Sequence, residues 1–237
     1  MTTKKLFVTA LIFISALTLI SAQSHTTAQT SISKKTILRM LAPAESKTVD
    51  TLSSTGYVRS EAFIYPDPAS NSLTTQSVDK NKNVMVYTKK PNYESINYLI
   101  GENYYYSSKP EYYTDSQQAK AIEKNIDLSL PWAFAPNFRV QRFSPTFINE
   151  DIKDLHYFLL DIKDKTKVSF TRTGNTRNYY ITNTIFNTDL TIEVTNNFIR
   201  SLAYKFTNGN QVLITFKPSN DLVTPPSPAI SFEELIN

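Results

Sequence analysis

The chain contains no cysteine, although its N-terminal segment resembles that of an exported protein. Its fold must therefore be stable without disulfide bonds, and this requirement restricts the possible folds more than any other feature of the sequence. Met1–Lys5 is positively charged, and a mainly apolar run follows from Leu6 to Ile20, before small residues that include Ala22 and Ser24. This order is typical of a secretory signal peptide, and the run is shorter than the roughly 20 apolar residues that span a bilayer. We therefore expect a signal peptide over residues 1–24, cleaved after Ala22 or Ser24. The alternatives are an uncleaved anchor and a buried helix.

An exported chain without cysteine must obtain its stability from a hydrophobic core. Roughly two hundred residues are enough to build such a core in one domain. The missing cysteine also argues against the anchor of bacterial lipoproteins, which is attached to that residue. The lack of an Asn-x-Ser/Thr acceptor favours a bacterial source. The net charge is +4 and nearly balanced without Lys4 and Lys5, so the chain lacks the basic bias expected of a nucleic-acid-binding protein.

Short strand patterns with polar turns fill most of the chain, and helical patterns interrupt them. Helices are expected at 34–52, as one helix or two because of Pro43, and at 115–125, 149–160 and about 232–236. Strands are expected at 57–65, 72–78, 84–88, 93–100, 104–108, 167–171, 178–182, 190–194, 198–206 and 212–216. The short connections favour antiparallel hairpins over βαβ units. We predict an α+β fold in which a curved, half-open, barrel-like antiparallel sheet packs on two or three helices.

The same patterns divide the exported chain into three parts. Residues 25–33 are rich in Ser, Thr and Gln without periodicity and are predicted to be a disordered leader. Residues 34–220 are predicted to be a single α+β domain, and residues 221–237 a proline-rich tail.

Motifs for catalysis and metal binding are missing from the sequence. There is no cysteine nucleophile, no Gly-x-Ser-x-Gly turn, no His-Glu-x-x-His helix and no calcium loop. His156 is the one histidine inside the predicted domain, and we interpret it as a packing or surface residue. Asp151 and Asp154 lie three apart on one helix, which we interpret as a solvated helix start and not as a paired-carboxylate site. We expect a non-enzymatic protein without a cofactor or metal.

Aromatic residues carry the remaining functional signal. Leu130–Phe138 holds three aromatic rings between and beside two prolines, which predict an irregular loop. This loop either covers the core or borders an apolar pocket. Tyr104, Tyr105 and Tyr106 follow one another in a predicted strand and must place rings on both faces of the sheet.

Taken in order, the elements resemble the exported lipid carriers of the LolA, LppX and LprG family. The matching segments are Val49–Tyr57, where a helix passes into a strand, and Leu190–Pro226. Within the second, Phe198–Leu202 and Val212–Phe216 are similar to the final strands of that family. The resemblance implies a curved sheet wrapped around helices, with acyl chains bound between them. Members of the LppX and LprG type carry an anchoring cysteine that this chain lacks, so the resemblance implies a soluble carrier.

We therefore expect an exported bacterial protein of the periplasm or cell envelope, a monomer, that holds a lipid or another hydrophobic molecule in an apolar cavity. Transient contact with a membrane or with envelope proteins is expected, and nucleic acid is not. The residues predicted to line the cavity are Phe63, Val86, Tyr98, Trp132, Phe134 and Phe158. The competing hypothesis is a secreted or surface adhesion module that uses its tyrosine-rich β face for contact.

Overall fold

The structure is a computed structural model that describes residues 30–136, 147–160, 162, 166–182 and 188–236. The chain divides into two units, residues 1–30 and 31–237. Only Thr30 of the first unit is among the described residues, so the predicted signal peptide lies outside them, as do residues 25–29 of the predicted leader and Phe138. None of the described helices is both long enough and apolar enough to cross a membrane.

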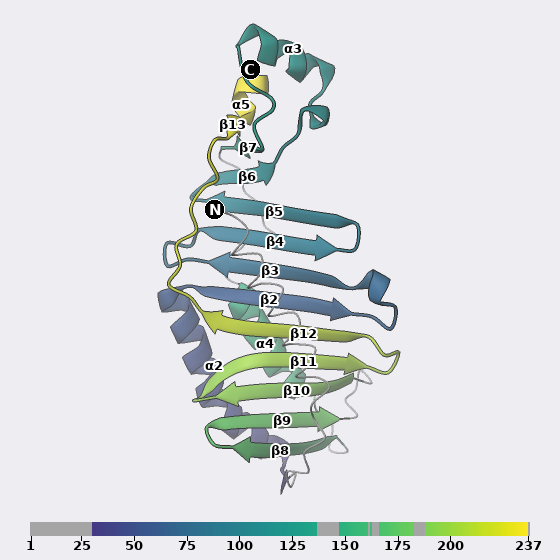
Figure 1. The fold of residues 1–237 in the computed structure, drawn as a ribbon. Coiled ribbons are helices and arrows are strands. Elements are labelled where there is room, and N and C mark those ends of the chain that lie inside the picture. The colour runs from purple at the N-terminus through teal and green to yellow at the C-terminus, as the bar shows by residue number, and fades with distance from the viewer. Residues whose placement is uncertain (1–29, 137–146, 161, 163–165, 183–187, 237) are drawn as a thin grey trace. The chain divides into compact units, whose positions relative to one another are not determined.

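The second unit is built on one sheet in which the strands follow the order β8-β9-β10-β11-β12-β2-β3-β4-β5-β6-β7-β13 (Figure 1). All neighbours are antiparallel except β7 and β13, which run parallel. The strand bounds are β1 (Thr30–Ser31), β2 (Tyr57–Ile64), β3 (Ser72–Val78), β4 (Val84–Lys90), β5 (Tyr93–Ile100), β6 (Asn103–Ser107), β7 (Trp132–Ala135), β8 (Lys167–Thr173), β9 (Thr176–Thr182), β10 (Thr188–Thr195), β11 (Phe198–Phe206), β12 (Gln211–Pro218) and β13 (Ile230–Ser231).

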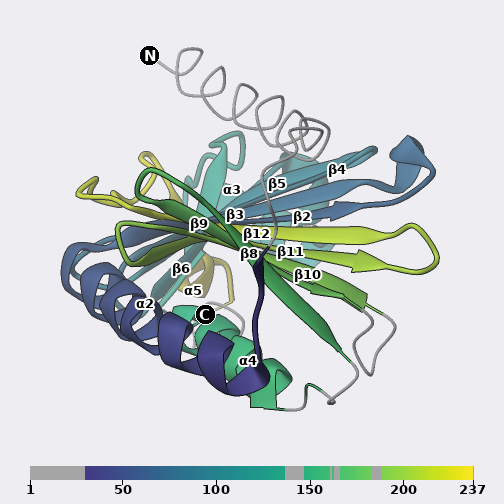
Figure 2. The same cartoon turned by 90° about the horizontal axis from the view of Figure 1, so that it is seen from below.

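The sheet is open, because the described strands at its two edges do not pair with each other. Figure 2 shows successive strands rotated against one another, as expected from the twist of β-sheets. Most neighbours are joined by short turns, and two seams among β2–β13 are long-range. β2 pairs with β12, from Tyr57 opposite Pro218 to Ile64 opposite Gln211, and β13 pairs with β7, with Ile230 opposite Ala133. The predicted α+β fold with an antiparallel sheet packed on helices is confirmed, and the sheet is not closed into a barrel.

Two helices, α2 (Lys34–Thr55) and α4 (Phe147–Leu160), lie side by side on one face of the sheet (Figures 1 and 2). The side chain of Ser33, which the sequence placed in the leader, caps α2 by accepting a hydrogen bond from the Thr36 amide at 3.2 Å. The helix continues through Pro43, whose side chain is exposed, so the segment forms one helix. The buried face of α2 consists of Ile37, Leu41, Ala44, Thr48 and Leu52.

The main core lies between these two helices and the sheet. Leu155 and Leu159 of α4 are completely buried there, together with Tyr179 and Ile192 of the sheet. Because strand residues alternate between faces, the buried residues of β10, such as Leu190, Ile192 and Val194, occupy every second position. This core supplies the stability that a chain without disulfides requires.

A smaller core lies at the other end of the sheet. Its buried residues are Tyr113, Ala121, Ala133, Ile230 and Leu235. They come from β7, β13, α3 (Asp115–Glu123), α5 (Phe232–Ile236) and the end of the 3-10 helix η2 (Pro110–Tyr112); a second such helix, η1 (Pro68–Ser70), follows β2. The segment predicted as a proline-rich tail therefore contributes a strand and a helix to the fold.

Two hydrogen bonds hold the beginning of the C-terminal segment against the sheet. After β12, the amide of Ser219 donates to the carbonyl of Gly56 at 3.1 Å, and the amide of Val223 donates to a carboxylate oxygen of Asp79 at 3.1 Å. The chain then runs along the strand ends to β13, which pairs with β7 (Figure 1). It thus connects β12, in the middle of the sheet, to the edge formed by β13.

The prediction of an irregular loop at Leu130–Phe138 is wrong for its middle part. Residues Trp132–Ala135 form β7, which pairs with both β6 and β13. Pro131 and Pro136 stand immediately outside this four-residue strand, so neither removes a hydrogen-bond donor from it. The prolines delimit the strand and do not prevent it.

Candidate functional site

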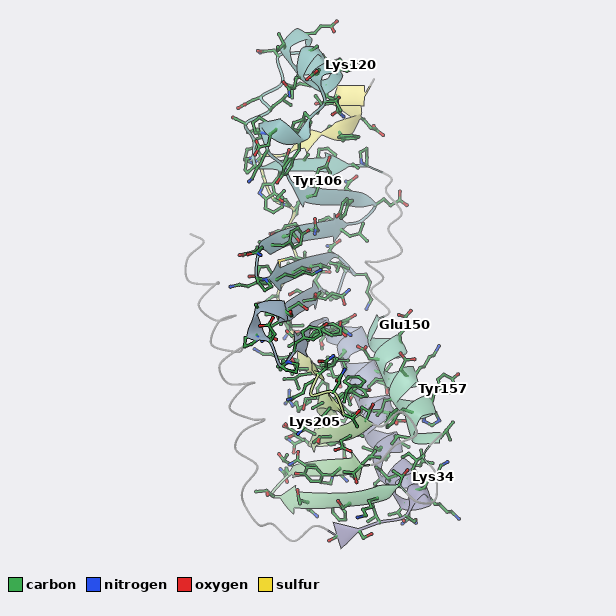
Figure 3. All side chains as sticks on the ribbon, turned by 90° about the vertical axis from the view of Figure 1, so that its right-hand side faces the viewer. Lys34, Tyr106, Lys120, Glu150, Tyr157 and Lys205 are labelled. Carbon is green, nitrogen blue, oxygen red and sulfur yellow. The ribbon has the colours of Figure 1, made fainter. Side chains whose placement is uncertain are left out.

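The strand register assigns every sheet residue to one of two faces. Tyr57 of β2 lies opposite Val78, and Val78 opposite Val84. All three belong to the core beneath α2 and α4. We call the face that contains them the helix face and the opposite one the open face. Figure 3 shows both helices on one side of the sheet, with the exposed Glu150 and Tyr157 of α4 pointing away from it.

Three of the predicted cavity residues lie on the helix side. Phe63 shares the face of Tyr57 and pairs with Val212. Val86, Val212 and the α4 residue Phe158 are half-buried side chains packed against the main core. The ring of Phe158 meets the ring of Tyr204 edge-on at a centroid distance of 6.2 Å. These residues form an apolar rim around the core.

The other three predicted residues, Tyr98, Trp132 and Phe134, lie on the open face. Tyr98 and Trp132 pack edge to face with centroids 5.4 Å apart. Phe134 stacks on Tyr105 at 5.3 Å. The six residues are therefore divided between the two faces of the sheet, and one cavity cannot contain them all. Their role in ligand binding stays a prediction.

A charged cluster connects α4 to the helix face. The Nε and Nη2 atoms of Arg59 donate to the two carboxylate oxygens of Asp151 at 2.6 and 2.9 Å, and its Nη1 donates to Glu61 at 3.1 Å. The side chains of Arg59 and Asp151 are only 11% and 12% exposed. This two-point contact fixes the start of α4 against β2.

Burial and charge act against each other in this cluster. Burial alone would lower the pKa of Arg59, but Asp151 and Glu61 outweigh it and raise that pKa, so the guanidinium stays charged. Burial, with smaller contributions from Glu61 and Asp154, raises the pKa of Asp151, although Arg59 acts to lower it. The bidentate geometry nevertheless matches an ionised carboxylate, because both of its oxygens accept hydrogen bonds. The pair is held together at a cost in desolvation.

The residues considered for catalysis have structural partners. The Nδ1 atom of His156 lies 3.4 Å from a carboxylate oxygen of Glu45, which links α4 to α2. Burial raises the pKa of Glu45, and His156 partly offsets this. Asp154 is exposed, and Asp151 binds Arg59. The two aspartates therefore do not form a carboxylate pair. Within the described ranges, no group of three or more His, Asp or Glu side chains could hold a metal ion.

Sequence reasoning missed Arg59, although a signal for it exists. In β2, Tyr57, Arg59, Glu61 and Phe63 share one face. Two charged residues between aromatic ones on a buried face require a partner from another element. Asp151, near the start of an amphipathic helix, was the available candidate.

Comparison with known proteins leaves the family of this chain open. No protein-family model and no curated protein matches its sequence. Among solved structures, it is similar to the crystal structure of a LolA superfamily protein from Nitrosomonas europaea, at 11% sequence identity and a TM-score of 0.27, over 81% of this chain and 96% of that one. This structural resemblance is weak.

Proposed function

We propose that this protein is a non-catalytic carrier that holds a hydrophobic molecule, such as a lipid, between the helix face and α4. The observation that carries this proposal is the incomplete burial of the apolar rim. Val86 on β4 and Leu99 on β5 continue the main core along the helix face but are only half-buried. In Figure 1, the helices α2 and α4 lie behind β2 and the strands from β12 to β8.

The rim supports binding of an acyl chain for a simple energetic reason. Each methylene group transferred from water to an apolar surface stabilises the complex by about 0.8 kcal/mol. Phe63, Val86, Leu99 and Phe158 offer such a surface without hydrogen-bonding requirements. The protein then needs no catalytic group, cofactor or metal for this function.

A ligand that extends from the rim beneath α4 requires this helix to move, and the Arg59–Asp151 pair suits such a movement. When an apolar contact opens, both surfaces lose burial. When a buried ion pair opens to water, both ions regain the hydration that burial had removed. Separating Arg59 from Asp151 therefore costs less than separating an apolar contact of equal burial. In this proposal the ion pair holds α4 against the sheet in the closed state, and its separation opens the ligand cavity.

The proposal includes export to the bacterial periplasm or cell envelope, where a monomeric carrier would exchange its ligand with a membrane or an envelope protein. The positive, apolar and small-residue order of the first 24 residues supports export. Native mass spectrometry of the protein purified from its own host tests the carrier function. Co-purified lipid supports the proposal, and its absence together with failure to bind a fluorescent fatty acid would refute it.

Neighbouring residues on β4 provide a matched pair of variants. Val86 lies on the helix face, whereas Met85 pairs with Tyr98 on the open face. Val86→Gln should weaken binding of the fluorescent fatty acid at least tenfold, and Met85→Gln should leave it unchanged. Equal effects of both variants would contradict a site on the helix face.

A second candidate function rests on the open face. The Tyr98–Trp132 and Tyr105–Phe134 ring pairs bring four aromatic side chains together there, which supports a contact surface of an adhesion or interaction module. The double variant Trp132→Ala/Phe134→Ala separates the two candidates. If this variant loses binding to the target cells of the adhesion module but still binds lipid, the result supports the adhesion module. Loss of lipid binding alone would move the ligand site to the open face.

A further inference from the structure

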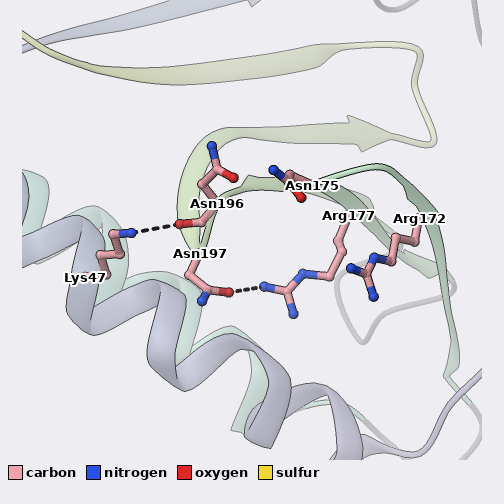
Figure 4. A pocket seen from close by; sticks show the side chains of 6 residues that line it. All are labelled: Lys47, Arg172, Asn175, Arg177, Asn196 and Asn197. Carbon is pink, nitrogen blue, oxygen red and sulfur yellow. Dashed lines mark hydrogen bonds between the residues drawn. The ribbon is translucent and has the colours of Figure 1, made fainter.

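A polar hollow of about 440 Å³ lies at one end of the strands β8–β11, beside α2 (Figure 4). It is separate from the apolar rim, and no step of the proposed carrier function uses it. Its lining consists of three cationic and three amide side chains: Lys47, Arg172, Arg177, Asn175, Asn196 and Asn197.

Two neighbouring hairpin turns form the walls. Gly174 lies in the turn between β8 and β9, and Asn196 and Asn197 connect β10 to β11, all with φ between 54° and 57°. Asparagine and glycine tolerate this left-handed backbone better than other residues. The amide of Asn196 donates to the carbonyl of Asn175 at 3.2 Å, so each turn supports the other.

The helix α2 closes the third side. The Nζ atom of Lys47 donates to the carbonyl of Asn196 at 3.0 Å. At the next residue, the hydroxyl of Thr48 accepts a hydrogen bond from the amide of Ile199 at 2.8 Å and is completely buried. The helix is therefore fixed to the β10–β11 turn, and the ammonium group of Lys47 is held at the hollow.

The two arginines stand directly opposite each other. Arg172 of β8 and Arg177 of β9 are register partners on the helix side of the sheet. Like charges in this position destabilise a strand pair. Arg172 donates from Nε to the carbonyl of Gly174 at 3.1 Å, and the guanidinium of Arg177 donates to the side-chain oxygen of Asn197. Both partners are neutral oxygens.

No carboxylate from the described residues forms a salt bridge with Lys47, Arg172 or Arg177. Three positive charges thus converge on one hollow, and two of them repel each other. A guanidinium has five N–H donors in a planar fork that matches the oxygens of a phosphate. An anion in the hollow would remove the repulsion and satisfy donors from three elements at once.

We propose that this hollow is a binding site for a phosphate group, carried either by a small soluble molecule or by the head group of an anionic lipid. Arg172 and Arg177 donate hydrogen bonds to the phosphate oxygens, and Lys47 adds a third positive charge. The asparagine side chains donate to the remaining oxygens.

The test is titration calorimetry of the full chain with glycerol 3-phosphate and inorganic phosphate, together with flotation on vesicles of phosphatidylcholine, with and without phosphatidylglycerol. The variant Arg172→Gln/Arg177→Gln removes the paired charges. The variant Lys35→Gln/Arg39→Gln removes the same charge from exposed positions of α2 outside the hollow. We expect the first variant to weaken binding at least tenfold and the second to leave it unchanged.

Each outcome decides the proposal. Binding of the soluble phosphates identifies a small ligand, and binding only to vesicles containing phosphatidylglycerol identifies a lipid head group. Failure of the wild-type protein to bind any of these probes, or equal weakening by both variants, overturns the proposal. A thermal melt without ligand shows whether the variant is folded. Arg172→Gln/Arg177→Gln should melt at the same or a higher temperature than wild type, because the repulsion between the two guanidinium groups has been removed. A lower melting temperature contradicts the argument from repulsion.

Discussion

Removing the Asp151 carboxylate tests the energetics of the buried charge cluster. Asp151→Ala leaves the guanidinium of Arg59 buried, with Glu61 at 3.1 Å as its remaining carboxylate partner. Breaking a buried ion pair in this way costs about 3–5 kcal/mol. We expect about 3 kcal/mol, the lower end, because Glu61 still compensates part of the charge. Urea denaturation followed by circular dichroism measures this loss as a lower midpoint at an unchanged slope.

Two further variants complete the experiment. Asp154→Ala, on the exposed side of α4, should change stability by less than about 0.5 kcal/mol. Replacing both partners, Arg59→Met with Asp151→Leu, should recover most of the stability lost in Asp151→Ala, because the apolar pair needs no desolvation of charge and only Glu61 then lacks its partner. If Asp151→Ala costs less than about 1 kcal/mol, or the double variant is no more stable than Asp151→Ala, the contact does not behave as a buried ion pair.

Substitutions at three other buried residues should change the stability of the fold in predictable directions. Thr48→Val leaves the amide of Ile199 without its acceptor and should cost about 1–3 kcal/mol, whereas Thr48→Ser should cost clearly less in the same urea titration. The hydroxyl of Tyr179 is buried and has no hydrogen-bond partner among the described residues; Tyr179→Phe should therefore leave the melting temperature unchanged or raise it, and a marked decrease would reveal a partner. Burial alone would raise the pKa of Asp79, but its hydrogen bonds, first that from the Val223 amide, lower it. The ionised carboxylate therefore stabilises the fold above about pH 4, the unfolded pKa, and this contribution disappears as the pH falls through the lowered value. The stability difference between wild type and Asp79→Ala should shrink on acidification, and a constant difference would contradict this assignment.

Local patterns predicted most of the elements, because each depends on neighbours in the sequence. The alternation in Leu190–Val194 and the turn at Asn196 and Asn197 were sufficient to predict the β10–β11 hairpin, which pairs antiparallel. The strand β7 was not predicted, because its four residues lie between two prolines and depend on β6 and β13 for their hydrogen bonds.

The candidate site was harder to predict for the same reason. Residue type alone cannot tell which face of the sheet a side chain occupies, since that is decided by the register with strands elsewhere in the chain. Phe63 and Val86 fall on the helix face, whereas Tyr98 falls on the open one. The pairing of Arg59 with Asp151 and the approach of Lys47 to Asn196 join positions far apart in the sequence. No local periodicity contains this information.

The seam between β2 and β12 has a consequence for how the molecule is made. The strands β2–β6 can assemble from local hairpins, but β2 receives its second neighbour only when β12 is present. Such long-range pairing is slow, because a large loop must close first. Until then, the unpaired edge of β2 is a template to which a strand of another chain can add. A chain that emerges N-terminus first therefore passes through a stage in which this edge can aggregate, and that stage ends only when β12, Gln211–Pro218, has appeared.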